Sequence, residues 1–519
     1  MRSRKNNSIR NILSGLIYQC SSILINIISR RFFIEYFGIE ILGMNGVLTS
    51  IISMLSLTES GIGIAIAQSL YVPLALNHKE EVNQIIVLFK KLYRIIAFAI
   101  LVLGLLLMPF LGYLVHTELE IHFVMAAYVV LLFNTSFSYL LACYQSLLIA
   151  DQRKYCVNFV LMLFNVIVNS LQILITLKTK NYFLFLIIKL ISDNIQNVVL
   201  YYTAKKRYPY LSMKKIGALP VQYKEKLRKN ISGLLVANLS TYLIFGTDNL
   251  LLSLVCGTAV VGLYSNYVII IRAVKNILSQ IFQGMTASYG NFLALKTKSE
   301  AFELFENVYF LNFWISSFCF SALFVLLNPF IEIWIGNEYL LPSGTVFLLC
   351  WNFYSDTMRS SIELVRSAAG LYSPYPFFKY WSFLEAVLNL VLSLFLGSYL
   401  GVFGVFLGTS ISSLISCYVM PWNVYKYVFD KTSVLFYHKY IVYQCICIIS
   451  TVITYKLGNL VATYNIYAQF IVKMLLCCVM PNLIIYCVYR RRKEYRFIHE
   501  SLSGKFRGRF MKLNHPNES

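Results

Sequence analysis

NILSGLIYQCSSILINIISRRFF, residues 11–33, is a long apolar stretch that ends in two adjacent arginines, Arg30 and Arg31. A membrane-spanning helix needs about 20 predominantly apolar residues, so we expect this stretch to cross a bilayer. The topology derived below places its far end outside the cell, where Lys and Arg are disfavoured. Charge inside a spanning segment is costly and usually marks a substrate or ion pathway. Arg30 and Arg31 are therefore the first candidate site residues.

The composition is that of a membrane protein. Of the 519 residues, 58% are hydrophobic and only 13% are charged, whereas a soluble domain is roughly 25% charged. The net charge of +22 is gathered in hydrophilic stretches between apolar runs, which suits an anionic cytoplasmic leaflet rather than nucleic acid. The 12 cysteines are scattered without metal-ligand spacing, so we expect buried thiols and no metal site. We expect no cleavable signal peptide.

About fourteen stretches are long and apolar enough to span a membrane, which predicts an all-α, polytopic membrane protein. The second and eighth are long and rich in glycine or polar residues, so we expect kinks or tilt in them. After residues 11–33 the predicted spans are Leu42–Leu70, Leu92–Val115, Phe123–Ile149, Val157–Leu177, Tyr182–Tyr202, Ile231–Leu254, Val260–Leu293, Val308–Ile335, Pro342–Ala369, Phe377–Leu396, Val402–Tyr425, Tyr440–Leu460 and Tyr467–Tyr489.

Positive charge sets the predicted orientation, because cytoplasmic connections carry an excess of Lys and Arg. The start of the chain is basic, and so is every second connection after it; the longest is Lys205–Lys229. The intervening connections are short and poor in cations, apart from Lys178 and Lys180. Both termini are therefore predicted to be cytoplasmic.

An internal repeat relates the two halves. IRNILSGL at 9–16 resembles LRKNISGL at 227–234, and Gly43 pairs with Gly262 at nearly the same offset. Six helices per unit keep both units in one orientation, related by an axis along the membrane normal. We therefore predict two six-helix bundles as a parallel pseudo-repeat, plus two C-terminal helices. The predicted limits are a first bundle at 1–204, a basic linker at 205–229, a second bundle at 230–426, helices thirteen and fourteen at 427–490 and a basic tail at 491–519.

Several motifs, taken in order, resemble a known family over essentially the whole chain. SIRN at 8–11 opens the first span, which ends in SRRFF, and FGIEILGMNG at 37–46, LSLTESGIG at 55–63, Thr247-Asp248 and GLYS at 262–265 follow. With the predicted layout of six, six and two helices, these motifs resemble the polysaccharide flippases of the multidrug/oligosaccharidyl-lipid/polysaccharide (MOP) exporter superfamily, the O-antigen or capsule-type branch.

That resemblance implies two helical bundles around a V-shaped cavity that moves undecaprenyl-diphosphate-linked oligosaccharide repeat units across the bacterial cytoplasmic membrane by alternating access. It implies a monomer that takes lipid-linked oligosaccharide as substrate and works beside a polysaccharide polymerase and a chain-length regulator. It implies no cofactor beyond a driving H⁺ or Na⁺ gradient.

Four cations are candidate substrate-binding residues of the cavity: Arg30, Arg31, Arg272 and Lys275. Arginine suits a lipid diphosphate, because its planar fork donates two parallel hydrogen bonds. Arg272 and Lys275 share one helix face and have no acid within a turn. The alternative for the arginine pair is that both reach to the outer interface, with Arg31 pairing with Glu35.

Two acids are candidates for gating or coupling. Asp248 lies 218 residues after Arg30, so the repeat places the two opposite one another, where their charges would close an outer gate by pairing. Glu59 lies beside Gly61 and Gly63, which fits a hinge or a coupling-ion site; the alternative is a protonated Glu59 that hydrogen-bonds between helices.

The spacing of the other intramembrane polar residues indicates structural roles. Lys189 and Asp193 are spaced as a helix-surface salt bridge. Asp356, Arg359, Glu363 and Arg366 share one helix face and predict a self-neutralising ladder. Asn169 and Asn389, at equivalent repeat positions, are expected to hydrogen-bond between helices.

The inventory of motifs argues against an enzyme, because the chain has no GxxxxGK[ST] phosphate loop and no HExxH among its six histidines. A multidrug or cation antiporter of the same superfamily is one alternative. Such exporters typically place carboxylates in the membrane part of the first bundle, whereas the first span here has arginines and no acid before Glu35. A non-transporting scaffold of a polysaccharide assembly complex is the other.

Overall fold

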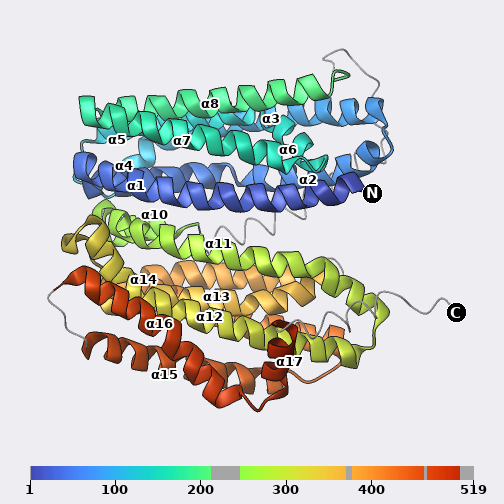
Figure 1. Cartoon of the computed structure of the whole chain (residues 1–519). Helices are drawn as coiled ribbons and strands as arrows, with labels where there is room; N and C mark the ends of the chain where they lie inside the picture. Colours follow the sequence, from blue (N-terminus) through green and yellow to red (C-terminus); the bar gives the residue numbers. More distant parts are fainter. Residues whose placement is uncertain (1, 212–245, 370–376, 461–464, 503–519) are drawn as a thin grey trace. The chain divides into compact units, whose positions relative to one another are not determined.

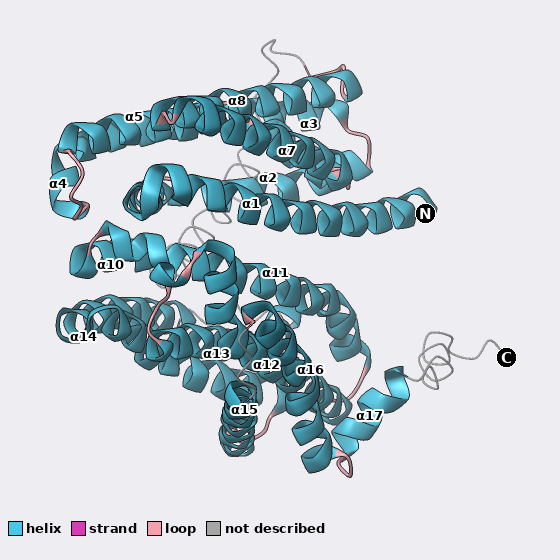
Figure 2. Ribbon diagram, turned by 60° about the vertical axis from the view of Figure 1, so that its left-hand side comes forward, coloured by secondary structure: helices cyan, strands magenta, loops and turns pink. Residues whose placement is uncertain are grey.

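The computed structural model describes residues 2–211, 246–369, 377–460 and 465–502. Over these residues the chain is helical and contains no strand (Figure 2). It divides into two compact units, Met1–Ser265 and Asn266–Ser519, which we call the first and the second unit. The predicted linker at 205–229 lies mostly outside the described residues, and so does the tail beyond 502. The sequence-based domain limits therefore stay predictions.

The first unit begins with the long helix α1, Arg2–Leu55, which bends at Gly38 where φ is 80° and ψ is 170°. The bend separates the first two predicted spans, and the second of them is interrupted at Ser56, as its glycine-rich sequence predicted. The remaining helices are α2 (Leu57–Ala75), α3 (Lys79–Leu107), α4 (Leu111–Leu114), α5 (Ile121–Tyr139), α6 (Ala142–Ala150), α7 (Lys154–Thr179), α8 (Tyr182–Arg207), α10 (Asp248–Cys256) and the start of α11 (Thr258–Leu295) (Figure 1).

The second unit contains the rest of α11 and a long bent helix, α14, Phe377–Val424. Gly401, with φ of 58°, makes the bend and separates two predicted spans. The other elements are α12 (Lys298–Ile335), η2 (Asn337–Tyr339), α13 (Ser343–Ala368), the short π-helix η3 (Tyr425–Phe429), α15 (Val434–Leu460), α16 (Ile466–Tyr489) and α17 (Lys493–Leu502).

Nine helices of the described residues are long and apolar enough to cross a membrane. The predicted all-α, polytopic membrane architecture is therefore confirmed. The bent helix α14 contains two predicted spans, whereas α1 contains the first span and the start of the second, which continues in α2. The long helices α11 and α13 are not among the nine; α13 carries four charged residues, whereas α11 carries two together with many polar residues. The predicted span Ile231–Leu254 is described only from residue 246 onward, and its helix α10 begins at Asp248.

Local sequence signals set several helix starts. The side chain of Asn181 accepts hydrogen bonds from two backbone N–H groups at the start of α8, and Asn465 does the same for α16. Thr297 and Glu300 form a reciprocal capping box at the start of α12. These contacts satisfy backbone donors that the first helical turn leaves without partners.

Asp151 ties together the end of the first unit where α6 ends and α7 begins. Its Oδ2 accepts from Arg153 Nε at 2.6 Å and from the Tyr208 hydroxyl at 2.6 Å. Burial, and then the neighbouring carboxylate, raise the pKa of Tyr208 well above its usual range. The phenol is therefore a fixed hydrogen-bond donor that holds the end of α8 to this turn.

In the second unit, α12 packs against α13, α15 and α16. Its buried Phe313 stacks on Tyr443 of α15 with ring centroids 4.0 Å apart, and buried Asn312 donates to the Thr357 carbonyl of α13 at 2.9 Å. Burial of aromatic rings and satisfied amide groups is a main source of helix association where neighbouring lipid is itself apolar. These contacts build the core that positions the charged residues of α13.

Candidate functional site

Two glycines in equivalent repeat positions adopt the same unusual backbone conformation. Gly38 has φ 80° and ψ 170°, and Gly257, 219 residues later, has φ 82° and ψ 169°. A side chain is strained in this region of φ, whereas glycine adopts it readily. Each residue ends one helical segment and starts the next, so the chain turns in the same way before residue 39 and before residue 258.

The segments that follow these turns, on α1 and α11, cross at a second pair of glycines. A Cβ atom at Gly43 would lie 1.6 Å from the carbonyl oxygen of Thr258, and one at Gly262 would lie 2.3 Å from that of Ile39. The two contacts are reciprocal, because 219 residues separate both Gly43 from Gly262 and Ile39 from Thr258. Only glycine permits helix backbones to approach so closely.

Arg30 on α1 lies beside this crossing. Its Nη1 donates to Ser265 Oγ of α11 at 3.2 Å. The equivalent contact comes from α10, where Asn249 Nδ2 lies 3.4 Å from the Gly46 carbonyl oxygen and 3.0 Å from Ser50 Oγ. The offset of 219 relates Arg30 to Asn249 and Gly46 to Ser265. The same contact is therefore made twice, once by a cation and once by a neutral amide.

Arg30 keeps unused hydrogen-bonding capacity. It is partly buried, and no carboxylate pairs with it in the part of the chain that the structure describes. Among the described residues its hydrogen-bond acceptor is the Ser265 hydroxyl, which itself donates to the Gly262 carbonyl at 2.8 Å. A guanidinium has five N–H donors and stays charged in proteins. Arg30 is thus a permanent cation within a spanning helix, with donors available for an anion.

Arg31 differs from its neighbour. Its side chain is exposed, as is that of Glu35, and no ion pair joins the two among the described residues. The alternative in which these two side chains pair is therefore not seen. Consecutive residues of a helix point about 100° apart, so only Arg30 of the two reaches Ser265.

Asp248 opens α10 and accepts from the Tyr264 hydroxyl at 3.1 Å. Arg30 and Asp248 thus contact adjacent residues of α11. The local offset of 219 relates Asp248 to Ser29, one residue from the pairing that an offset of 218 gave. Glu59 lies in the first turn of α2, and its side chain is outside the described part of the structure.

The candidates of the second unit have a different environment. Arg272 is exposed, and Lys275 pairs with Asp356 of α13. Asp356 also accepts from Arg359 at 3.1 Å, and Arg359 pairs with Glu385 of α14 at 3.3 Å. Ser416 donates to the same Glu385 carboxylate. The result is a chain of two cations and two carboxylates that links α11, α13 and α14.

The ladder predicted on α13 is present, since Arg366 also pairs with Glu363 at 3.2 Å. Its extension to Lys275 and Glu385 was missed, because these partners come from other helices and no sequence spacing connects them. Lys189 and Asp193 pair at 3.2 Å, as predicted. Asn389 donates to Ser412 at 3.3 Å across the bend of α14, whereas Asn169 donates to Asn165 of its own helix. Among the described residues, no group of His, Cys, Asp and Glu side chains could hold a metal ion.

Comparison with known proteins gives a match in fold only. No family model and no curated protein matches the sequence. A solved structure of the lipid II flippase MurJ in an inward closed conformation aligns with 92% of this chain and 99% of its own, with a TM-score of 0.68 and 14% identity.

Multidrug transporters also align. An inward-facing MATE family transporter of the MOP superfamily covers 78% of this chain and 94% of its own, with a TM-score of 0.57 and 12% identity. A Vibrio cholerae MATE transporter covers 82% and 98%, with a TM-score of 0.56 and 15% identity. These neighbours are transporters and a flippase, not enzymes. The chain is therefore a multi-pass membrane protein with the fold of MOP-superfamily transporters.

Proposed function

We propose that this protein flips undecaprenyl-diphosphate-linked oligosaccharide repeat units across the bacterial cytoplasmic membrane by alternating access, for capsule, O-antigen or exopolysaccharide synthesis. The observation that carries the proposal is Arg30. It is a permanent cation on a spanning helix, it contacts a neutral hydroxyl, and no carboxylate balances it among the described residues. An unbalanced cation inside a membrane needs an anion, and a substrate diphosphate supplies one.

The geometry of arginine favours this substrate class. A guanidinium donates two parallel hydrogen bonds to phosphate oxygens, and the contact to Ser265 uses only Nη1. In this proposal Arg30 binds the diphosphate while the isoprenoid tail remains in lipid. Arg31 and Arg272, both exposed, supply further positive charge along the path of the head group. Lys275 does so only in a state in which its pair with Asp356 opens.

The fold neighbours support a lipid-linked substrate, since the flippase among them is described as acting on lipid II and aligns with a higher TM-score than the multidrug transporters. A multidrug or cation antiporter is the second candidate function. It would require a carboxylate that meets a cationic drug in the first unit. The unbalanced cation Arg30 on the first helix would repel a cationic drug, which disfavours this candidate. A non-transporting scaffold remains the third.

The repeat fits two six-helix bundles related by an axis along the membrane normal, with two helices beyond them. The equal conformations of Gly38 and Gly257 and the reciprocal contacts of Gly43 and Gly262 support this arrangement. Both termini are proposed to be cytoplasmic, on the charge pattern of the connections. Asp248 and Glu59 are kept as gating and coupling candidates, with H⁺ or Na⁺ as the coupling ion, and a polymerase and a chain-length regulator as partners.

Deletion of the gene tests the reaction. Lipid-linked repeat units are expected to accumulate on the cytoplasmic face of the membrane, where an added impermeant glycosidase or lectin cannot reach them in intact cells. Accumulation on the outer face would assign the protein to a later, polymerising step. Unchanged export with lost assembly of partner proteins would favour the scaffold.

A further inference from the structure

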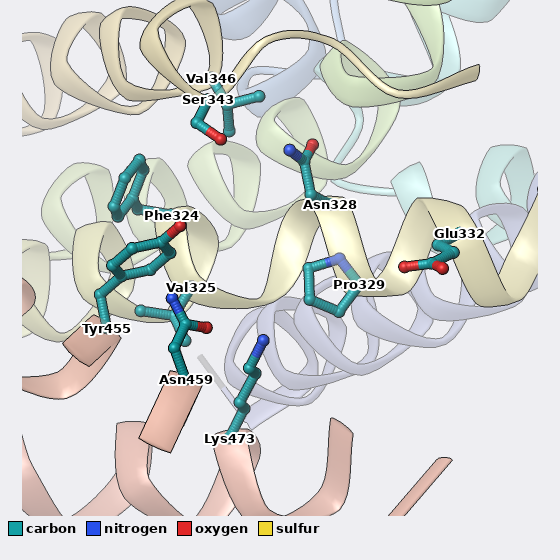
Figure 3. A pocket seen from close by; sticks show the side chains of 10 residues that line it. All are labelled: Phe324, Val325, Asn328, Pro329, Glu332, Ser343, Val346, Tyr455, Asn459 and Lys473. Atoms are coloured by element: carbon teal, nitrogen blue, oxygen red, sulfur yellow. The ribbon is translucent and has the colours of Figure 1, made fainter. Parts of the chain in front are cut away.

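A polar cavity lies in the second unit between α12, α13, α15 and α16, apart from the charged chain described above. Its volume is about 190 Å³, far above the ~10–15 Å³ that one water needs. Figure 3 shows its lining side chains. The polar ones are Asn328, Glu332, Ser343, Tyr455, Asn459 and Lys473.

Lys473 of α16 is the notable member of this lining. Only 7% of the residue is exposed, yet it makes no hydrogen bond or ion pair within the residues that the structure describes. Its aliphatic stem packs against α15 at Gly458, where a Cβ atom would lie 3.1 Å from Lys473 Cγ. The side chain extends toward the cavity (Figure 3). An ammonium that lines a polar cavity without a carboxylate partner among the described residues attracts an anionic ligand.

The cavity offers further polar groups at the same place. Pro329 has no N–H, so the carbonyl of Val325, one turn earlier on α12, lacks its helical donor; both residues line the cavity. Ser343 is the first residue of α13, and the start of a helix carries free N–H groups and a partial positive charge. The free carbonyl favours a hydrogen-bond donor on the ligand, and the N–H groups at the start of α13 favour phosphate-like acceptors.

Glu332 on α12 gives the cavity its second charge, opposite in sign to Lys473. It is exposed and lies near the end of α12, three residues before Ile335, or ~5 Å along the helix. Lys473 lies seven residues into α16, ~10 Å from that helix's start. Lys473 is therefore the deeper residue of the two and Glu332 the outer one. A free anion would be attracted by the first and repelled by the second.

We propose that this cavity binds a lipid headgroup that carries both a phosphate and a primary ammonium, as in phosphatidylethanolamine. The phosphate would accept hydrogen bonds from Lys473 and from the start of α13, and the ammonium would donate to Glu332. In such a lipid the phosphate lies nearer the acyl chains than the amine does, which is the order of Lys473 and Glu332 in depth. The net charge of the pair is zero and matches a net-neutral headgroup.

Lipid titration of the purified full chain in detergent, followed by native mass spectrometry, tests this site. Phosphatidylethanolamine should bind at least tenfold more tightly than phosphatidylglycerol. Lys473→Met should weaken phosphatidylethanolamine binding at least tenfold. Lys456→Met, an exposed lysine of α15 outside the cavity, is the matched control and should change it less than twofold. Lys473→Arg, which keeps the charge, should retain most of the binding.

Glu332→Gln tests the second half of the proposal at an exposed residue. It should reduce the preference for phosphatidylethanolamine over phosphatidylglycerol to less than twofold. Wild-type affinity in Lys473→Met, or an unchanged preference in Glu332→Gln, would overturn the proposal. Soluble O-phosphoethanolamine distinguishes the sources of the headgroup. If O-phosphoethanolamine displaces the lipid at equal concentration, the ligand of the cavity is a soluble compound. If it does not displace the lipid, the ligand is the lipid itself.

Discussion

Arg30 of the first unit and the cations Lys275 and Arg359 of the second unit stand in opposite electrostatic environments. In the first unit, Arg30 contacts a serine hydroxyl, and the described residues bring no carboxylate to it. In the second unit, Lys275 and Arg359 are joined to Asp356 and Glu385 in a charge-balanced chain. A balanced buried chain holds helices in one arrangement, because opening it exposes unpaired charge. An unbalanced cation does not hold helices in this way and is available for a ligand.

The largest expected effect is the loss of Arg359. Arg359→Met leaves Glu385 buried without its cation and Asp356 with only Lys275. Removing one partner of a buried ion pair typically costs about 3–5 kcal/mol, so we expect the free energy of unfolding in detergent to fall by that order. Denaturant titration followed by tryptophan fluorescence measures it.

A double variant separates charge balance from lost packing. In Arg359→Met/Glu385→Gln the remaining charges, Lys275 and Asp356, balance each other. The double variant should therefore recover at least half of the stability that the single variant loses. Equal stability of the two variants would mean that the chain is held by packing, and the contrast between the units would weaken.

The next effect concerns the crossing that brings Ser265 to Arg30. Gly43→Ala places a Cβ atom 1.6 Å from the backbone oxygen of Thr258, so α1 and α11 must move apart. Overpacking of this kind costs about 1–3 kcal/mol. Gly46→Ala is the matched control, because its Cβ would meet Val261 at 3.5 Å, an ordinary contact. Thermal unfolding of the two variants in the same detergent measures the difference. Equal unfolding midpoints for Gly43→Ala and Gly46→Ala would contradict the close crossing of α1 and α11.

Arg30→Gln should have the smallest effect on stability. The variant loses one hydrogen bond, and the Ser265 hydroxyl keeps its bond to the Gly262 carbonyl, so no buried donor is left unsatisfied. We expect a change of about 1 kcal/mol or less, well below that of Arg359→Met. A loss as large as that of Arg359→Met would show that Arg30 stabilises the fold as much as Arg359 does.

Sequence alone predicted the helices but not which cations are balanced. Apolar length predicted the spans, and the motif order led to the fold family. Arg30 and Lys275 look alike in sequence. Each is a cation in an apolar run, and no Asp or Glu lies within one helical turn of it. The difference arises from Asp356, which lies on another helix far along the chain. Such a partner depends on tertiary packing, and no local spacing encodes it.

The repeat shows the same limit in another way. Matching letters gave an offset of 218 near the first span and 219 at Gly43 and Gly262, and so related Arg30 to Asp248. The backbone of Gly38 and Gly257 fixes the local offset at 219 and relates Arg30 to Asn249. Short similar segments do not show where the repeat offset changes by one residue. Two turns with the same unusual φ do show the offset at their own positions.

The export activity of an Arg30 variant, measured in a strain that lacks the native gene, tests directly whether Arg30 binds the substrate diphosphate. Arg30→Gln, present in the membrane at the wild-type amount, should reduce polysaccharide export at least tenfold, since the loss of charge-assisted hydrogen bonds worth about 1.5–3 kcal/mol corresponds to about tenfold or more. Lipid-linked repeat units should then accumulate on the cytoplasmic face. Lys456→Met, which replaces an exposed lysine that is not among the proposed substrate-binding residues, should leave export unchanged. Full export by Arg30→Gln would show that Arg30 does not bind the substrate diphosphate.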